Sequence, residues 1–275
     1  LNAVDQEGGR VKRQRHGEVA LPAMGLLQTA GNPEQVAREC GWLMAWEVLA
    51  MGIDFSFAPV LDLDYGRSAV IGLRSFGGDV DTVNTLAGAF LQGMQAAGMP
   101  AVGKHFPGHG WVTADSHVAI PVDERSLADI QQADLIPFKH LQHALAGLMP
   151  AHVIYPQVDT APAGFSKVWL QDILRQQLNY PGVLFSDDLS MAGAHVAGDA
   201  AQRLLAALNA GCNVGLICND RGAAEQALSA LQAENIAPCA DLSAMYGRYI
   251  SQHDFQQHPR WQSARHILKT LTSNG

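Results

Sequence analysis

The feature that most constrains the fold of this chain is the alternation of short apolar runs with longer segments of helical period. This alternation is typical of βαβ units built around a parallel sheet. It predicts strands over residues 2–5, 55–60, 101–104, 148–154, 183–186 and 214–217. It predicts helices over residues 33–51, 82–97, 127–145, 168–178, 199–210 and 222–233. We therefore expect an α/β protein.

Two of the predicted helices begin with recognisable capping residues. Asn32 suits the N-cap position, and Pro33 suits the first helical position because the N–H that proline lacks would have no partner there. Ser126 and Asp129 have the spacing of a capping box. Hydrophobic residues make up 48% of the chain, which is enough for one sizeable core, and no linker divides it. We therefore expect residues 1–275 to form a single domain.

Polar side chains gather where the predicted strands end. In a parallel α/β fold the carboxyl ends of the strands hold the ligand site, so many strands feed one site here, as in a barrel. An open doubly wound sheet is the weaker alternative, because the glycines after the first strand lack the spacing of a phosphate-binding loop. We expect a TIM-type (β/α) barrel. The strand-end groups are Asp5-Gln6-Glu7, Asp62, Asp64, Lys104-His105, His152, Ser186-Asp187-Asp188 and Cys218-Asn219-Asp220.

Charge and cysteine content limit the partners and the compartment. The chain has 18 Lys and Arg against 26 Asp and Glu, a net charge of −8, so it has no general electrostatic attraction to nucleic acid or to anionic membranes. Four irregularly spaced cysteines predict neither a disulfide framework nor a structural zinc site, so we expect a cytoplasmic protein. No apolar run approaches the roughly 20 residues of a membrane-spanning helix. We expect a monomer that needs no cofactor and acts on a small molecule.

The loop that follows the strand at residues 101–104 carries three histidines and one aspartate, namely His105, His109, His117 and Asp115. The Pro-Gly and His-Gly steps within it prevent a regular helix. Asp115 lies two residues before His117, so its carboxylate can accept the Nδ1–H of that imidazole and leave Nε2 free for acid/base chemistry. Two alternatives remain open: the histidines are structural, or they bind a metal ion together with Asp115.

A second strand ends in two adjacent carboxylates, Asp187 and Asp188. Neighbouring side chains on an extended segment diverge, so one of them is expected to face the site while the other caps the next turn or pairs with a cation. Spacing does not decide between them, and both could be capping residues.

Five segments together identify the chain as resembling glycoside hydrolase family 3, in particular the bacterial β-N-acetylglucosaminidases (β-hexosaminidases). The resemblance extends from residue 1 to about residue 220. The segments are Asp5-Gln-Glu-Gly-Gly-Arg10-Val-Lys-Arg13, Gly72-Leu-Arg74-Ser-Phe, Lys104-His-Phe-Pro-Gly-His-Gly, Asp115-Ser-His117 and Phe185-Ser-Asp-Asp-Leu-Ser-Met.

The resemblance implies a retaining exo-glycosidase with a TIM-like barrel that removes terminal non-reducing β-N-acetylglucosamine from 1,6-anhydro-muropeptides during cell-wall recycling. It implies that Asp187 is the nucleophile and that His117, held by Asp115, is the acid/base. Retaining glycosidases ordinarily use a second carboxyl group in that role, and an imidazolium stabilised by Asp115 can replace it. By the same resemblance, the sugar would be bound by Asp5, Arg13, Arg74, Lys104 and His105.

The sequence begins with Leu1, inside a predicted strand and without an initiator Met. Enzymes of the family have another βα unit before this segment, so we expect the barrel to lack its first βα unit in this sequence, with the missing residues upstream.

Several alternatives remain at this point. A glycoside phosphorylase would use the same Asp187 and His117 with an added phosphate site, a metal-dependent barrel hydrolase would use the histidines as ligands, and a sugar-binding protein would not turn over. Arg74 could pair with strand-end carboxylates instead of with a sugar. Trp111 could stack on a sugar face or simply pack.

Overall fold

The computed structural model describes residues 1–13, 20–113, 120–239 and 242–272 of the chain. Six of its strands run parallel to their neighbours. Isolated parallel bridges from Ser56 to Ala101 and from Val60 to Lys104 connect the first pair of strands to the other four. The strands follow one another in space in the order β1 (Ala3–Val4), β2 (Phe55–Ser56), β3 (Val102–Phe106), β4 (Gly147–Pro150), β7 (Val183–Asp188) and β8 (Val214–Leu216).

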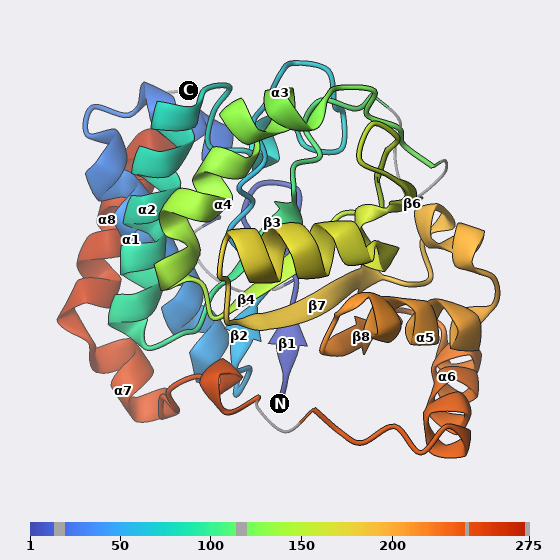
Figure 1. Cartoon of the computed structure of the whole chain (residues 1–275). Coiled ribbons are helices and arrows are strands. Elements are labelled where there is room, and N and C mark those ends of the chain that lie inside the picture. The colour runs from blue at the N-terminus through green and yellow to red at the C-terminus, as the bar shows by residue number, and fades with distance from the viewer. Residues whose placement is uncertain (14–19, 114–119, 240–241, 273–275) are drawn as a thin grey trace.

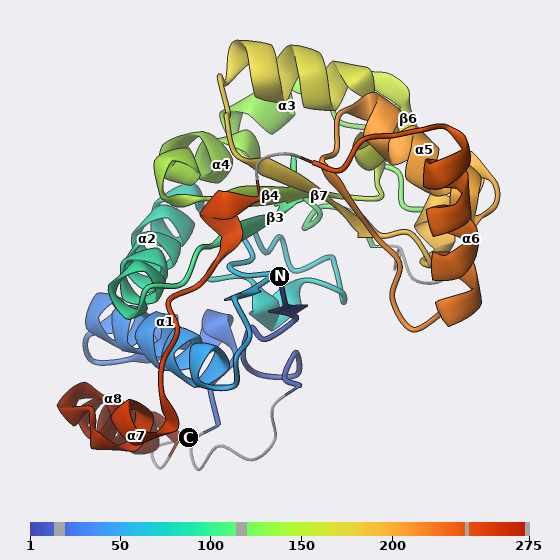
Figure 2. The ribbon, with the colours of Figure 1, turned by 90° about the horizontal axis from the view of Figure 1, so that it is seen from below.

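The helices lie outside these strands, as the two views in Figures 1 and 2 show. This arrangement is the predicted TIM-type (β/α) barrel. The α-helices are α1 (Pro33–Ala50), α2 (Val80–Ala97), α3 (Leu127–Gln132), α4 (Leu135–Leu141), α5 (Ala200–Ala210), α6 (Arg221–Ala233), α7 (Gln252–Gln257) and α8 (Pro259–Thr272). A π-helical segment, η5 (Val168–Gln177), occupies the remaining predicted helix, and short 3-10 turns cover Met24–Thr29, Gly72–Arg74, Gln142–Ala144, Ala163–Phe165, Ala192–Ala197 and Ser243–Met245.

Aromatic side chains fill the interior of the barrel. The ring of Phe185 on β7 lies 5.4 Å from the ring of Phe55 on β2 and 5.5 Å from that of Phe57, although β2 and β7 are not neighbours in the sheet order. A Cβ on Gly147 of β4 would lie 2.9 Å from the Phe185 ring, so the absence of a side chain there gives the ring its space. The strands are therefore held together by a packed core and not around a pore.

The predicted helix over 127–145 is wrong as one continuous element, because the structure breaks it into α3, α4 and a final 3-10 turn. Pro137 explains the break, since it has no N–H to donate to the carbonyl of Ala133 and its ring clashes with that carbonyl. Ala133 is the C-cap of α3, which ends at Gln132. The capping box of Ser126 and Asp129 is present, and so is the N-cap bond from the Gln35 N–H to Asn32.

The predicted strand over 148–154 is also two elements. β4 ends at Pro150, and β5 (Ile154–Tyr155) pairs antiparallel with β6 (Asp159–Pro162), a hairpin that the sequence did not reveal. Ala151, His152 and Val153 between them are fully buried, so burial continues through the turn. Burial therefore does not distinguish the residues between β4 and β5 from those in the two strands.

The C-terminal helices pack against α1. Arg260 forms an ion pair with Glu39, with Nε 2.9 Å from Oε2, and the Trp46 indole N–H donates to the Phe255 carbonyl at 3.2 Å. His258 lies against the stacked rings of Trp42 and Trp46. Within the described part of the chain, no helix has the length and apolarity to cross a membrane.

Helices α1 and α2 approach closely at two glycines. A Cβ on Gly41 of α1 would lie 2.1 Å from the Phe90 carbonyl oxygen of α2. A Cβ on Gly93 of α2 would lie 2.1 Å from the Arg38 carbonyl oxygen of α1 and 2.6 Å from the Trp42 nitrogen. Because backbone cannot move aside as a flexible side chain can, this contact requires glycine on both helices.

Gly93→Ala is therefore expected to lower the free energy of unfolding by about 2 kcal/mol or more, because the added methyl group forces two helices apart. Gly88→Ala, on the same helix, is the matched control, because its Cβ would meet nothing closer than a Leu141 side-chain atom at 3.5 Å. That variant is expected to gain up to about 1 kcal/mol of helix propensity. Denaturant unfolding compares the two, and equal stabilities would contradict the close-contact argument.

Candidate active site

The ends of β1 and β3 are joined by buried ion pairs. The Lys104 ammonium lies 2.8 Å from Asp5 Oδ1 and 2.6 Å from Glu7 Oε1. Arg74, from the turn after β2, binds the same Glu7 carboxylate with Nε at 2.9 Å and Nη2 at 2.8 Å. The side chains of Lys104 and Glu7 are 3% and 4% exposed, whereas Asp5 is 42% exposed and so presents its carboxylate to the barrel mouth.

The charges in this cluster stabilise one another. Burial alone would raise the pKa of Glu7, but the Lys104 and Arg74 charges outweigh it and lower this pKa to about 2. Burial would likewise lower the pKa of Lys104, yet Glu7 and Asp5 raise it. Glu7 and Lys104 are therefore both ionised at neutral pH.

A second buried carboxylate, Asp62, orients the histidines that follow β3. It accepts the backbone N–H of His105 at 3.2 Å and that of His109 at 2.7 Å, and it lies 2.7 Å from His105 Nδ1. Burial would raise the pKa of Asp62, but His105 and these hydrogen bonds lower it. Because Nδ1 is held by Asp62, the Nε2 atom of His105 is left for contact with a ligand.

Asp187 and Asp188 diverge at the end of β7, as predicted. Asp188 accepts from the Ser190 N–H at 2.9 Å, the Ser190 hydroxyl at 2.7 Å and the Cys218 N–H at 3.0 Å, so it caps the following turn. Asp187 is partly exposed, and its Oδ1 accepts only the N–H of Asp188, at 2.8 Å, among the hydrogen bonds of the described residues. Of the two carboxylates, Asp187 is thus the one available to contact a ligand.

Neighbouring side chains lower the pKa of Asp187. Burial would raise its pKa, but His105, His152 and Lys104 together lower it. His152 is fully buried after β4, its ring stacks on Phe165 at 5.2 Å, and burial lowers its pKa. Asp187 is therefore a carboxylate at neutral pH, with Lys104, His105 and His152 near it.

The structure brings together five of the eight residues expected at the site: Asp187, Asp5, Arg74, Lys104 and His105. The exposed Arg13 donates its backbone N–H to Gln6 Oε1 at 2.8 Å, and its guanidinium has no hydrogen bond to the described residues. Asp115 and His117 lie outside the described residues. Among residues 1–13, 20–113, 120–239 and 242–272, no group of three or more His, Cys, Asp or Glu has the geometry to hold a metal ion.

Residues 1–245 match the N-terminal domain of glycosyl hydrolase family 3. The chain belongs to glycosyl hydrolase family 3. It is 61% identical to a β-hexosaminidase of Pseudomonas aeruginosa over 269 residues, a match that covers 98% of this chain and 81% of that protein. A crystal structure of NagZ from Neisseria gonorrhoeae in complex with N-trifluoroacetyl-D-glucosamine matches with a TM-score of 0.86 and 40% identity, covering 98% of this chain and 80% of that one. The β-N-acetylhexosaminidase from Beutenbergia cavernae matches with a TM-score of 0.79 and 29% identity, covering 99% and 77%.

Four further residues of this family 3 site were assigned no part in sugar binding or catalysis by the sequence analysis, although His109 was considered as a metal ligand: Glu7, Asp62, His109 and His152. Glu7, Asp62 and His109 follow predicted strands and His152 lies near the end of one, so their position was a usable signal. Their roles could not be predicted from the sequence, because each role depends on which residue of another strand lies within hydrogen-bond or ion-pair distance. Arg74 also belongs in part to the structural network that was the alternative, since it pairs with Glu7.

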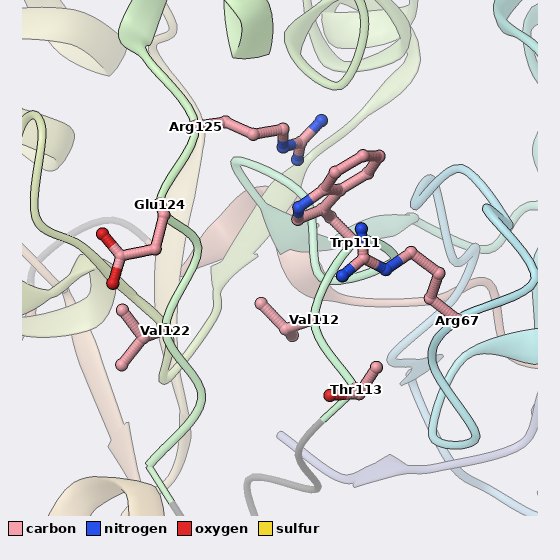
Figure 3. Close-up of a pocket in the computed structure, with 7 residues that line it drawn as sticks. All are labelled: Arg67, Trp111, Val112, Thr113, Val122, Glu124 and Arg125. Carbon is pink, nitrogen blue, oxygen red and sulfur yellow. The ribbon is translucent and has the colours of Figure 1, made fainter.

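Trp111 packs between two arginines in this glycoside hydrolase. Arg67 Cζ lies 4.2 Å and Arg125 Cζ 4.6 Å from the indole ring, and Figure 3 shows the indole between the two guanidinium groups. The Tyr65 ring meets it edge-on at 5.1 Å. The faces of the indole are therefore occupied by side chains of the protein itself, and the packing alternative holds.

The lowered pKa of Glu7 predicts a pH-dependent stability. Its contribution, about 3 kcal/mol, is fully present above pH 4.5 and is lost as the pH falls toward 2, because the carboxylate must then take up a proton. We expect Glu7→Gln to lower the free energy of unfolding by about that amount at pH 7 and to reduce the loss of stability between pH 5 and pH 3.

The exposed Glu225, which pairs with Arg221 on α6, supplies the control. Glu225→Gln should change stability by less than about 0.5 kcal/mol at either pH. Denaturant unfolding at the two pH values checks both variants. A Glu7→Gln protein as stable as the wild type at pH 7 would show that the buried cluster contributes nothing.

Proposed function

We propose that the chain is a retaining exo-glycosidase that hydrolyses terminal non-reducing β-N-acetylglucosamine from peptidoglycan fragments. The substrates would be N-acetylglucosaminyl-1,6-anhydro-N-acetylmuramyl peptides, released during cell-wall recycling. The observation that carries the proposal is the ionised, partly exposed Asp187 at the barrel mouth, with His105, His152 and Lys104 around it. The β-hexosaminidase names of the relatives and the glucosamine derivative bound by the Neisseria NagZ support the choice of sugar.

In the first step a carboxylate oxygen of Asp187 attacks the anomeric carbon of the sugar, and the bond from that carbon to the glycosidic oxygen breaks. His117 gives its proton to the departing oxygen. In the second step neutral His117 takes a proton from water, the water oxygen bonds to the anomeric carbon, and Asp187 leaves as a carboxylate. Two inversions at the same carbon give net retention. Asp115 would stabilise the charged imidazolium.

The sugar hydroxyls would be held by Asp5, Arg13, Arg74, Lys104 and His105. Charged groups suit this task because each hydroxyl both donates and accepts. Lys104 and Arg74 are themselves fixed by Glu7, so they keep their positions before the sugar arrives. Such preorganisation lowers the free-energy cost of ordering side chains on binding.

We further propose that residues 1–275 act as one catalytic domain and as a cytoplasmic monomer. The packing of α8 on α1, through Arg260 and Glu39, supports the first point. A reducing compartment suits Cys40 and Cys212, which are free and buried.

The nucleophile assignment predicts that Asp187→Asn lowers kcat on a 4-nitrophenyl β-N-acetylglucosaminide by at least about 1,000-fold, because an amide cannot form the glycosyl-enzyme. Asp188→Asn is the matched control one residue away, and it should lose less than about tenfold because Asp188 caps a turn. Equal losses in the two variants, with unchanged melting temperatures, would contradict the assignment.

The acid/base assignment predicts that His117→Ala slows hydrolysis of a methyl glycoside by about 100- to 10,000-fold, and of the 4-nitrophenyl glycoside much less in the glycosylation step. The nitrophenolate leaving group departs without protonation, whereas the oxygen of the methyl glycoside must be protonated as its bond breaks. Equal losses with both leaving groups would remove His117 from this role. Turnover that rises with inorganic phosphate and yields a sugar phosphate would instead indicate a phosphorylase.

A further inference from the structure

His152 is a buried histidine at the end of β4 to which the mechanism above gives no task. It lies between Ala151 and Val153, and all three residues are fully buried. Neither ring nitrogen has a partner at hydrogen-bond distance in the described ranges of the chain. A polar side chain in such a place costs free energy that an apolar residue would not, so its presence there calls for a physical reason.

The pairing of β4 with β7 places this imidazole at the level of the nucleophile. The two strands are parallel neighbours (Figure 1), with Gly147 opposite Val183. Continued in step, this register sets His152 opposite Asp188 and one residue beyond the level of Asp187. The polar groups that face the ring are accordingly the carboxylates and the backbone of Asp187 and Asp188.

Both the backbone and the ring of His152 are held in place. The Ala151 N–H donates to the Phe106 carbonyl of β3 at 2.8 Å, and the Ala151 carbonyl accepts the Gly164 N–H at 3.2 Å. The imidazole stacks on the ring of Phe165, with 5.2 Å between the ring centroids and 20° between the planes. The imidazole is therefore fixed beside β7 before any substrate binds.

Burial determines the protonation state of this ring. It lowers the pKa of His152, so the imidazole is uncharged at neutral pH and carries one N–H. A neutral donor of this kind holds a carboxylate or a carbonyl without adding a charge to the core. Hydrogen bonding to a carboxylate also favours its ionised form, and His152 is one of the groups that lower the pKa of Asp187.

We propose that His152 is a positioning residue for the nucleophile, whose imidazole holds the end of β7 and keeps the Asp187 carboxylate aimed at the sugar. The inference rests on the proposed function and deepens it, because His152 is fully buried and acts through Asp187 without contacting the sugar. A fixed carboxylate attacks the anomeric carbon without first reorganising. In the second step, the same N–H stabilises the negative charge that returns to Asp187 as its bond to the sugar breaks.

The test compares three replacements of His152 that differ in their hydrogen-bonding groups. His152→Phe keeps a ring for the stack on Phe165 and removes both nitrogens, whereas His152→Gln and His152→Asn supply an amide N–H near the positions of Nε2 and Nδ1. Hydrolysis of the 4-nitrophenyl glycoside is measured from about pH 4 to about pH 8. Activity regained at pH 7 after exposure to each pH checks that the protein stays folded.

The pH dependence of kcat/KM reports the free enzyme, in which Asp187 must be ionised to attack. The variants change His152 alone and leave the other titratable groups that face Asp187 in place. Those groups are Lys104, His105, His109 and Cys218.

His152→Phe is expected to lower kcat/KM at pH 7 by at least about tenfold, because the carboxylate is no longer held in position. It should also move the acidic limb of the profile to higher pH by about 0.5 to 1 unit, because Asp187 loses a group that lowers its pKa. One of the two amide variants should recover at least about threefold of the lost kcat/KM and part of the shift.

Met94→Ala is the control for lost stability, since Met94 is fully buried near the C-terminal end of α2. It should lower the melting temperature and leave both kcat/KM and the acidic limb within about twofold of the wild type. Phe165→Leu is the second probe if the His152 variants do not fold. It keeps the imidazole but removes the ring on which the imidazole stacks, and it should reproduce part of the shift in the acidic limb.

The inference is overturned if His152→Phe keeps the kcat/KM and the profile of the wild type. Equal losses in all three His152 variants with an unmoved acidic limb would also overturn it, because His152 would then be a packing residue only. If those variants do not fold, an unmoved limb in Phe165→Leu has the same meaning. A wild type that does not hydrolyse the glycoside rejects the proposed function and this inference together, whereas an active wild type with unchanged variants rejects the role of His152 alone.

Discussion

The buried carboxylate of Glu7 is the interaction on which the mouth of this barrel depends. It joins the end of β1 to the end of β3 through Lys104 and to the turn after β2 through Arg74. The charges of Glu7, Lys104 and Arg74 depend on one another, because only ion pairing compensates the free-energy cost of removing each charge from water. The cluster therefore fixes two cations near the strand ends, and the charge of Lys104 helps to lower the pKa of Asp187.

Much of the fold follows from local signals that agree with one another. Asn32 and Pro33 mark the start of α1, and short apolar runs mark the barrel strands, because burial on both sides of a parallel strand demands an apolar run. The failures also have physical causes. Pro137 breaks a helix that the apolar periodicity continues through, and the turn at His152 divides two strands although the chain stays buried there.

The site could be predicted from the sequence only in part. The position of a residue at a strand end can be read from the local sequence, whereas its hydrogen-bond and ion-pair partners from other strands cannot. Asp187, Asp5, Lys104 and His105 follow strands and lie together as expected. Asp188 caps a turn because it accepts hydrogen bonds from Ser190 and from Cys218, which follows the neighbouring strand β8. No spacing within the Asp187-Asp188 segment reveals this.

The central claim is that Asp187 forms a covalent bond to the sugar. The most direct measurement is mass spectrometry of peptides from the enzyme after treatment with a fluorinated N-acetylglucosaminyl donor, whose glycosyl-enzyme hydrolyses slowly. We expect one equivalent of sugar on the peptide that contains Asp187, located on that residue by fragmentation and absent from the Asp187→Asn variant. Sugar on Asp188 or on another carboxylate, or complete turnover with no adduct and inverted product, would contradict it.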